Sequence, residues 1–125
     1  MELKKQISIF LKNRPGALAE VTGTLAREGV NILAISVSDT VDHAVVRFIV
    51  DQNEKAKAVL EKQKFLVVEN DVLAVPLSNQ PGKLGDIATK LGKGNINIEY
   101  AYGTTIAANG DALVIFRVSD VRKAL

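Results

Sequence analysis

The sequence predicts an α+β fold in which one βαββαβ module occurs twice within 125 residues. Three observations predict it: an internal repeat, short β-prone runs that alternate with helical patterns, and a composition of 47% hydrophobic and 24% charged residues that is typical of a globular chain. We expect two modules, at residues 1–70 and 71–125, each with an antiparallel sheet covered by helices as a sandwich.

The internal repeat joins two segments, residues 13–32 and 79–98, which align without a gap at an offset of 66. Seven of the twenty aligned positions are identical. A period of this length indicates a duplicated domain rather than a solenoid. The identical pairs are Asn13/Asn79, Pro15/Pro81, Gly16/Gly82, Leu18/Leu84, Leu25/Leu91, Asn31/Asn97 and Ile32/Ile98.

The first half of the first copy predicts a strand, a helix and a second strand. Residues 6–11 form a β-prone run, and the turn-forming segment 13–16 ends it. We expect the following helix to close at Gly29 and Asn31, before the β-rich run 32–37. The helix is predicted from residues at helical spacing, which are Leu18, Val21, Thr22 and Leu25.

The second half of the first copy predicts a third strand, a second helix and a fourth strand. Residues 40–42 can turn the chain, so the run 45–50 pairs with the preceding strand as a hairpin. Residues 51–53 offer helix caps, and residues 65–68 supply the last strand. One face of the predicted helix carries Ala56, Val59, Leu60 and Gln63.

The second copy repeats this order with a strand at 72–77, a helix from Pro81 to about Gly92, and strands at 96–104 and 113–118. Its hairpin is longer, so an offset of 68 aligns its last strand with the first copy. Because this shift is even, equivalent side chains face the helices in both copies. The aligned pairs are Val46/Val114, Phe48/Phe116 and Val50/Val118.

The second copy ends early. Ser119 and Asp120 can cap a last helix, but the sequence stops at Leu125 before a fourth strand. We therefore expect either that the sequence is a fragment or that another molecule packs against the open sheet edge, which favours an oligomer.

Composition excludes several kinds of protein. The sequence has no cysteine, so disulfides, thiolate nucleophiles and cysteine-based metal or redox sites are excluded. The 16 Lys and Arg and 14 Asp and Glu are spread along the chain, which argues against a nucleic-acid groove. No apolar run reaches the roughly 18 residues of a membrane span, and the first residues lack a secretion signal, so we expect a cytoplasmic protein.

Catalytic and metal sites also lack candidates. The single histidine, His43, has no second imidazole with which to share a transition metal, so we expect no metal or cofactor. No carboxylate pair suited to general acid-base catalysis is evident among Asp39, Asp42, Glu99 and Asp111. We therefore expect no catalytic residues.

The βαββαβ order is shared by proteins of unrelated function, so the function has to be inferred from the residues of the site and not from the fold. An RNA-recognition module needs stacking aromatics in its central strands, but residues 45–50 and 113–118 contain one Phe each. An enzyme of the acylphosphatase type needs a Gly-rich anion loop with its Arg, and we find no such loop. Tyr100 and Tyr102 share a strand face, where sheet packing is favoured over ligand contact.

The repeated turn suits a free amino acid. In NRPGAL and NQPGKL an Asn ends a strand, a Pro starts a helix, and a Gly lets the backbone approach a ligand closely. Backbone N–H groups at the positive end of the helix suit a carboxylate. We expect the second Asn of each copy, Asn31 or Asn97, to lie beside the turn, so that two amide oxygens accept hydrogen bonds from an ammonium group.

These two turns, with GVNI or NINI opening the next strand, resemble ACT domains, which have a ferredoxin-like fold. The first copy is most similar to the ACT module that confers serine feedback on phosphoglycerate dehydrogenase. The resemblance implies that Asn13 and Asn31, and by repeat Asn79 and Asn97, hold an amino acid between paired modules. Leu11 and Leu77 stand where that module carries a His, which argues against serine.

We therefore predict a non-catalytic regulatory protein that binds a small amino acid at interfaces between modules, forms a homodimer and signals through its oligomeric state or an unknown partner enzyme. The alternative is a ligand-free structural or dimerisation module that docks such an enzyme. Asn13 and Asn79 could instead only cap helices, Asn31 and Asn97 could only end them, and Arg14 and Gln80 are favoured as solvent-exposed. The predicted ligand-binding residues are Asn13, Arg14, Pro15, Gly16, Ala17, Leu18, Asn31, Ile32, Asn79, Gln80, Pro81, Gly82, Lys83, Leu84, Asn97 and Ile98.

Overall fold

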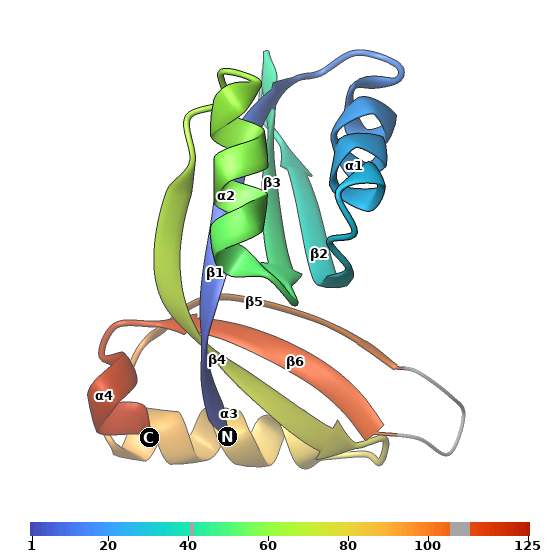
Figure 1. The fold of residues 1–125 in the computed structure, drawn as a ribbon. Coiled ribbons are helices and arrows are strands. Elements are labelled where there is room, and N and C mark those ends of the chain that lie inside the picture. Colours follow the sequence, from blue (N-terminus) through green and yellow to red (C-terminus); the bar gives the residue numbers. More distant parts are fainter. Residues whose placement is uncertain (41, 106–110) are drawn as a thin grey trace. The chain divides into compact units, whose positions relative to one another are not determined.

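The predicted α+β order is confirmed in a computed structural model, which describes residues 1–40, 42–105 and 111–125 (Figure 1). The paired strands are antiparallel, and the strand order of the sheet is β2-β3-β1-β4-β6-β5. The elements are β1 (Glu2–Lys12), α1 (Ala17–Arg27), β2 (Ile32–Asp39), β3 (His43–Val50), α2 (Asn53–Lys62), β4 (Val68–Ser78), α3 (Lys83–Lys93), β5 (Ile98–Thr105), β6 (Asp111–Val118) and α4 (Val121–Ala124).

One pair of predicted strands is a single strand in the structure. The sequence predicts separate strands at residues 65–68 and 72–77, whereas β4 runs without interruption from Val68 to Ser78. The intervening polar residues look like a break in the pattern, but they continue the strand because β4 takes part in both repeats. The predicted hairpin turn at 40–42 includes Val41, which lies outside the described residues.

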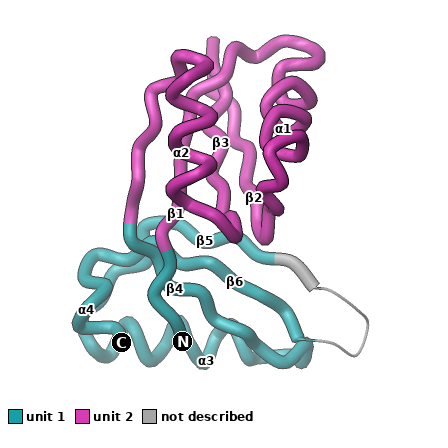
Figure 2. Tube along the Cα trace, in the orientation of Figure 1, with its two compact units in different colours: residues 1–4, 71–125 teal, residues 5–70 magenta. Residues whose placement is uncertain are grey.

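The chain divides into two compact units (Figure 2). We call residues Lys5–Asn70 the first module, and we call Met1–Lys4 together with Asp71–Leu125 the second module. The first residues of β1 thus belong to the second module, and β1 is the neighbour of β4 in the sheet. Met1–Lys4 thus lie in the same unit as the predicted open edge, while the expected packing of another molecule stays a prediction.

The first module has a core between one face of its strands and two helices. Alternate residues of β1 and β3 face inward with α1 and α2, and Phe48 is completely buried. This inward alternation is the expected consequence of the two-residue period of a strand. The cluster consists of Ile7, Ile9, Leu11, Ala17, Val21, Leu25, Val30, Ala44, Val46, Phe48, Val50, Ala56 and Leu60.

The second module repeats this arrangement with a smaller core. Phe116 and Val118 occupy the positions of Phe48 and Val50 at an offset of 68, as predicted. The last helix, α4, has only 4 residues, and the Asp120 side chain accepts a hydrogen bond from the Lys123 N–H, so the predicted cap is confirmed. The buried cluster consists of Leu73, Val75, Leu91, Ile96, Phe116 and Val118.

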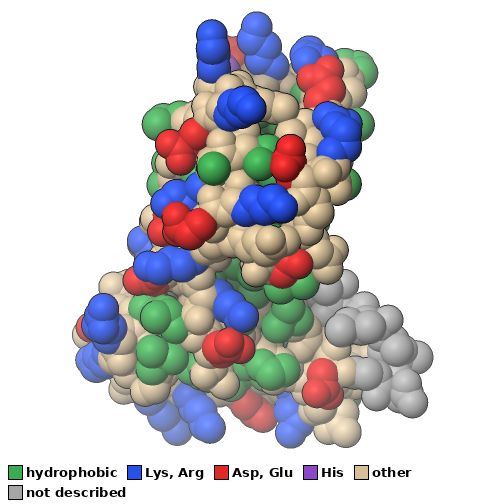
Figure 3. All heavy atoms as spheres, viewed as in Figure 1, with side chains coloured by type: hydrophobic (Ala, Val, Ile, Leu, Met, Phe, Trp, Pro, Cys, Tyr) green, Lys and Arg blue, Asp and Glu red, His purple; other side chains and the backbone are tan. Residues whose placement is uncertain are grey.

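Charges of both signs are interspersed over the face of the molecule drawn in Figure 3. That face shows no area of a single sign, as expected from charges that are spread along the sequence. No helix among the described residues is both long enough and apolar enough to cross a membrane.

Candidate functional site

The two repeated turns have the same backbone conformation. Gly16 has φ 84° and ψ −10°, and Gly82 has φ 88° and ψ −11°, so both lie in the left-handed region at the N-cap of their helix. Glycine adopts this conformation without the steric cost that a Cβ imposes. The chain can therefore turn from strand to helix within four residues, and the backbone at the start of α1 and α3 is not covered by a side chain at Gly16 or Gly82.

The first helical turn leaves backbone N–H groups without partners. The N–H of Glu20 donates to the Gly16 carbonyl, and the N–H of Asp86 donates to the Gly82 carbonyl, each at 3.0 Å. Among the described residues, three earlier N–H groups at each turn have no hydrogen bond. At the first turn they belong to Gly16, Leu18 and Ala19, and at the second turn to Gly82, Leu84 and Gly85. Such groups carry the positive end of the helix dipole and favour an anion such as a carboxylate.

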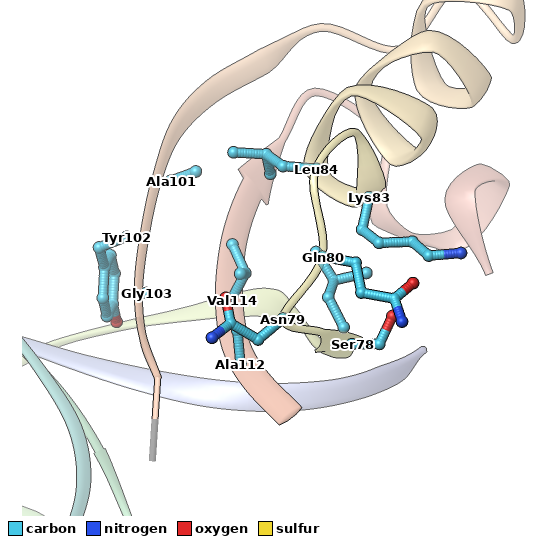
Figure 4. Close-up of a pocket in the computed structure, with 11 residues that line it drawn as sticks. Ser78, Asn79, Gln80, Lys83, Leu84, Ala101, Tyr102, Gly103, Ala112 and Val114 are labelled. Atoms are coloured by element: carbon cyan, nitrogen blue, oxygen red, sulfur yellow. The ribbon is translucent and has the colours of Figure 1, made fainter. Parts of the chain in front are cut away.

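A pocket of about 650 Å³ opens beside the second of these turns, entirely within the second module (Figure 4). Its walls come from the end of β4, the start of α3, and β5 and β6. The lining residues are Leu77, Ser78, Asn79, Gln80, Lys83, Leu84, Ala101, Tyr102, Gly103, Ala112 and Val114.

The pocket has a polar end and an apolar end. Asn79 and Leu84 point toward β5 and β6, whereas Gln80 and Lys83 point away from them (Figure 4). Asn79 belongs to the turn that exposes the free N–H groups, and Leu84 points toward Ala101 on the opposite wall. A ligand with a charged head and a short apolar group matches this distribution.

The second asparagines lie away from the turns. β3 pairs with β1 at Lys12/His43 and with β2 at Ile32/Val50, so Asn13 and Asn31 lie at opposite ends of β3, roughly 23 Å apart at about 3.3 Å per residue. The prediction that Asn31 lies beside the turn of its own copy is wrong, because α1, about 16 Å long at 1.5 Å per residue, carries the chain back across the sheet.

The second module places its asparagines in the same way. β6 pairs with β4 at Ser78/Asp111 and with β5 at Ile98/Val118, so Asn79 and Asn97 also lie at opposite ends of the sheet. Two hydrogen bonds of 2.9 Å hold the Asn97 backbone to Ser119. The Asn97 N–H donates to Ser119 Oγ, and the Ser119 N–H donates to the Asn97 carbonyl. No single module therefore brings both carboxamides to one ligand.

The alternative roles of the four asparagines are not observed as stated. The N-cap positions are Gly16 and Gly82 rather than the asparagines. α1 ends at Arg27, so Asn31 lies beyond the helix, where its N–H donates to Asp51 Oδ1 at 2.9 Å. Within the described residues, the Asn13 side chain makes no hydrogen bond.

Several predicted site residues have structural surroundings instead. Ala17 is buried in the first core, and Ile32 and Ile98 pack against the cores of their modules. Arg14 is half exposed and its Nη2 lies 3.0 Å from Glu20 Oε2, so its charge is paired. Pro15, Leu18, Pro81 and Lys83 are exposed at the turns.

The sequence interpretation missed the wall that β5 and β6 contribute. Ala101, Gly103, Ala112 and Val114 line the pocket but resemble ordinary strand residues in the sequence. The aligned registers of the two copies could have identified them, because they place Ala101 and Gly103 on the helix-facing side. Tyr102 also lines the pocket, although its ring lies on the other side of β5 and stacks with Tyr100 at a centroid distance of 6.5 Å (Figure 4).

The described part of the chain holds no group of three or more His, Cys, Asp or Glu residues arranged to bind a metal ion. The Glu99 carboxylate lies 3.8 Å from Arg117 Nε, in a surface ion pair. The polar groups at the pocket are carboxamides, hydroxyls, the Lys83 ammonium group and backbone N–H groups, which bind ligands by hydrogen bonds or charge.

Comparisons with known proteins agree with this arrangement. The crystal structure of protein BT0572 from Bacteroides thetaiotaomicron matches with a TM-score of 0.90 and 36% identity, over 98% of this chain and 83% of that one. The ligand-free regulatory subunit of aspartate kinase from Thermus thermophilus shares the fold, with a TM-score of 0.72 and 16% identity over 100% of this chain and 93% of that one.

The acetolactate synthase small subunit of Buchnera aphidicola subsp. Schizaphis graminum (strain Sg) is 33% identical over 75 residues, which are 58% of this chain and 46% of that protein. The match thus spans less than half of that relative. The family model described as "ACT domain pair" matches residues 1–125. Since this match covers every residue from the first turn to the second, the chain belongs to the ACT domain pair family.

Proposed function

We propose that this protein is a non-catalytic regulatory protein that binds a small free amino acid at the repeated turns and signals through its oligomeric state or a partner enzyme. The observation that carries the proposal is the pocket beside Asn79, which opens next to the unpartnered N–H groups of Gly82, Leu84 and Gly85. A turn that served only as a scaffold would have these groups satisfied or the space filled.

The pocket supplies the interactions that a zwitterion requires. The carboxylate accepts hydrogen bonds from the free N–H groups at the start of α3, where the helix dipole also favours negative charge. The ammonium group donates to the Asn79 amide oxygen, and the side chain lies against Leu84 and Ala101.

A second carboxamide for the ammonium group comes from another copy of the chain. Asn79 and Asn97 lie at opposite ends of one sheet, so a two-fold axis that pairs two second modules edge to edge brings Asn79 of one toward Asn97 of the partner subunit. A ligand that bridges two copies stabilises the dimer by its differential affinity, and this couples occupancy to oligomeric state.

The relatives support a regulatory role with a partner enzyme. One similar protein is named a small subunit of acetolactate synthase, and a protein of the same fold is named a regulatory subunit of aspartate kinase. A chain of this kind acts by attaching to a catalytic subunit, and its amino-acid ligand then changes that attachment.

One observation favours the second candidate function, a ligand-free docking module. Three large apolar residues of β2 are exposed, Leu33 at 44%, Ile35 at 41% and Val37 at 49%. Leu18 at the start of α1 is 38% exposed. Exposed apolar rows of this kind mark interaction surfaces, so the first module has a surface that suits a partner protein.

A thermal-shift screen of the twenty amino acids tests the proposal. A ligand at about 100 times its Kd adds about 2.7 kcal/mol to the free energy of unfolding and raises Tm by several degrees. Asn79→Ala removes a hydrogen bond to a charged group and weakens binding by about tenfold or more in calorimetry.

Lys90→Ala is the matched control, because Lys90 lies on the same helix outside the pocket residues and its loss leaves binding unchanged. If none of the twenty amino acids raises Tm, the sensing function is rejected and the docking function is favoured.

A further inference from the structure

The space beside the turn is lined by small residues in the second module, whereas branched aliphatic residues stand at the equivalent positions of the first, where Ile35 is 41% and Val37 49% exposed. Ile35 pairs with Phe48 and Val37 pairs with Val46 on the helix-facing side of the first sheet. At an offset of 66 these two positions are Ala101 and Gly103, and they pair with Phe116 and Val114. The registers are equivalent, so the positions are structurally equivalent too.

The two substitutions remove a defined amount of side chain. Ala101 has three carbon atoms fewer than Ile35, and Gly103 has three fewer than Val37. The other walls are similar in the two modules, with Leu77, Ala112 and Val114 in place of Leu11, Ala44 and Val46. In the first module, larger side chains thus stand at the two positions that leave this space open in the second.

We propose that the two modules have divided their roles, so that only the second module binds the ligand, an amino acid with an aliphatic side chain of three or four carbon atoms. This rests on the proposed function. The ligand's side chain occupies the space between Leu84, Ala101 and Gly103, where Ile35 and Val37 act as a built-in substitute in the first module.

The apolar wall of the pocket selects against polar side chains, whereas the polar lining residues Ser78, Asn79, Gln80 and Lys83 lie at the turn and the start of α3 (Figure 4). Leu77, Leu84, Ala101, Ala112 and Val114 provide no hydrogen-bonding side-chain atoms. A hydroxyl, carboxylate or ammonium group on the ligand's side chain would lose its water there without gaining a partner, at a cost in affinity. Aliphatic groups gain from the same transfer.

Gly103 keeps this wall open for a geometric reason. A Cβ at this position would lie 2.9 Å from the Leu113 carbonyl oxygen and 3.0 Å from a Val114 methyl group. Any side chain at this position therefore has to push β5 away from β6, whereas Ala101 already carries a Cβ that the strand accommodates. Ala101 is for this reason the better position for a test.

The test is isothermal titration calorimetry of the full chain with valine, isoleucine and leucine, compared with serine, aspartate and lysine. We expect one aliphatic amino acid to bind per chain. Ala101→Ile restores the residue that the first module has and weakens binding by at least about tenfold. Leu84→Phe fills the pocket from the opposite wall at an exposed position, and it gives the same loss if Ala101→Ile does not fold.

Ile35→Ala is the matched control at the equivalent position of the first module, and it leaves the affinity unchanged. Two ligands per chain, preference for a polar amino acid, or full affinity in folded Ala101→Ile would overturn the division of roles. In each of these cases the wild-type chain still binds an amino acid, so the proposed function stands. Absence of binding by the wild-type chain removes both proposals.

Discussion

The two modules share one order of elements but differ in how much they bury. Among the described residues, the core cluster of the first module has thirteen buried members and that of the second has six. The first module includes a ten-residue α2, whereas α4 of the second has four residues. The module with the open pocket is thus also the one with the smaller core, so the first repeat contributes more buried apolar side chains to stability.

The largest effect is expected from truncating the central Phe of each core. Phe48→Ala lowers the free energy of unfolding by about 3–5 kcal/mol, because Phe48 is fully buried in a large cluster. Phe116→Ala costs less, since its partly buried neighbours, Ile87, Ile98 and Val114, can close the cavity more easily. Urea unfolding followed by circular dichroism measures both changes, and equal costs would contradict the inequality between the cores.

An intermediate and equal effect is expected at the two turns. Gly16→Ala and Gly82→Ala each lower the free energy of unfolding by about 1–2 kcal/mol, because L-residues are strained at positive φ. An added Cβ meets nothing within 4 Å at either position, so backbone strain alone sets the cost.

Gly92→Ala is the control for these variants. Gly92 lies within α3, is exposed and has free space around it, so the added methyl group stabilises the helix by about 0.5–1 kcal/mol. Thermal unfolding separates the two signs. A large difference between Gly16→Ala and Gly82→Ala would show that the turns are not energetically equivalent.

The smallest effect on stability is expected at the hydrogen bonds that hold the backbone N–H groups of Asn31 and Asn97. The Asn31 N–H donates to the Asp51 carboxylate and the Asn97 N–H donates to the Ser119 hydroxyl, both at 2.9 Å and both exposed. Asp51→Ala costs about 1 kcal/mol and Ser119→Ala about 0.5 kcal/mol in chemical denaturation, since a charged acceptor forms the stronger hydrogen bond. Asp51→Asn keeps an oxygen acceptor, and a cost as large as that of Asp51→Ala would show that the hydrogen bond is not the cause.

Much of the fold could be predicted from the sequence because the repeat doubles each signal. The match of residues 13–32 with 79–98 identified both turns, and the even offset of 68 correctly predicted that Phe116 lies in the core. Helical spacing and the repeat identified α1, α2 and α3, with boundaries a few residues from those observed. These features depend on local periodicity, which a sequence displays directly.

The rest depends on contacts between residues that are distant in sequence. No local pattern shows that β4 serves both modules or that Met1–Lys4 belongs with residues 71–125. The pocket was missed because it arises from the small size of Ala101 and Gly103, which lack the branched side chains of Ile35 and Val37. The error over Asn31 had another cause, since the length of α1 already requires the second Asn to lie at the far end of the sheet.

The assignment of Met1–Lys4 to the second module has a consequence for biosynthesis. The first module is one continuous segment and can fold as soon as residue 70 has left the ribosome. The second module combines Met1–Lys4 with residues 71–125, so its assembly depends on contacts of high sequence separation, which form slowly. The module with the pocket is therefore expected to assemble after the first module.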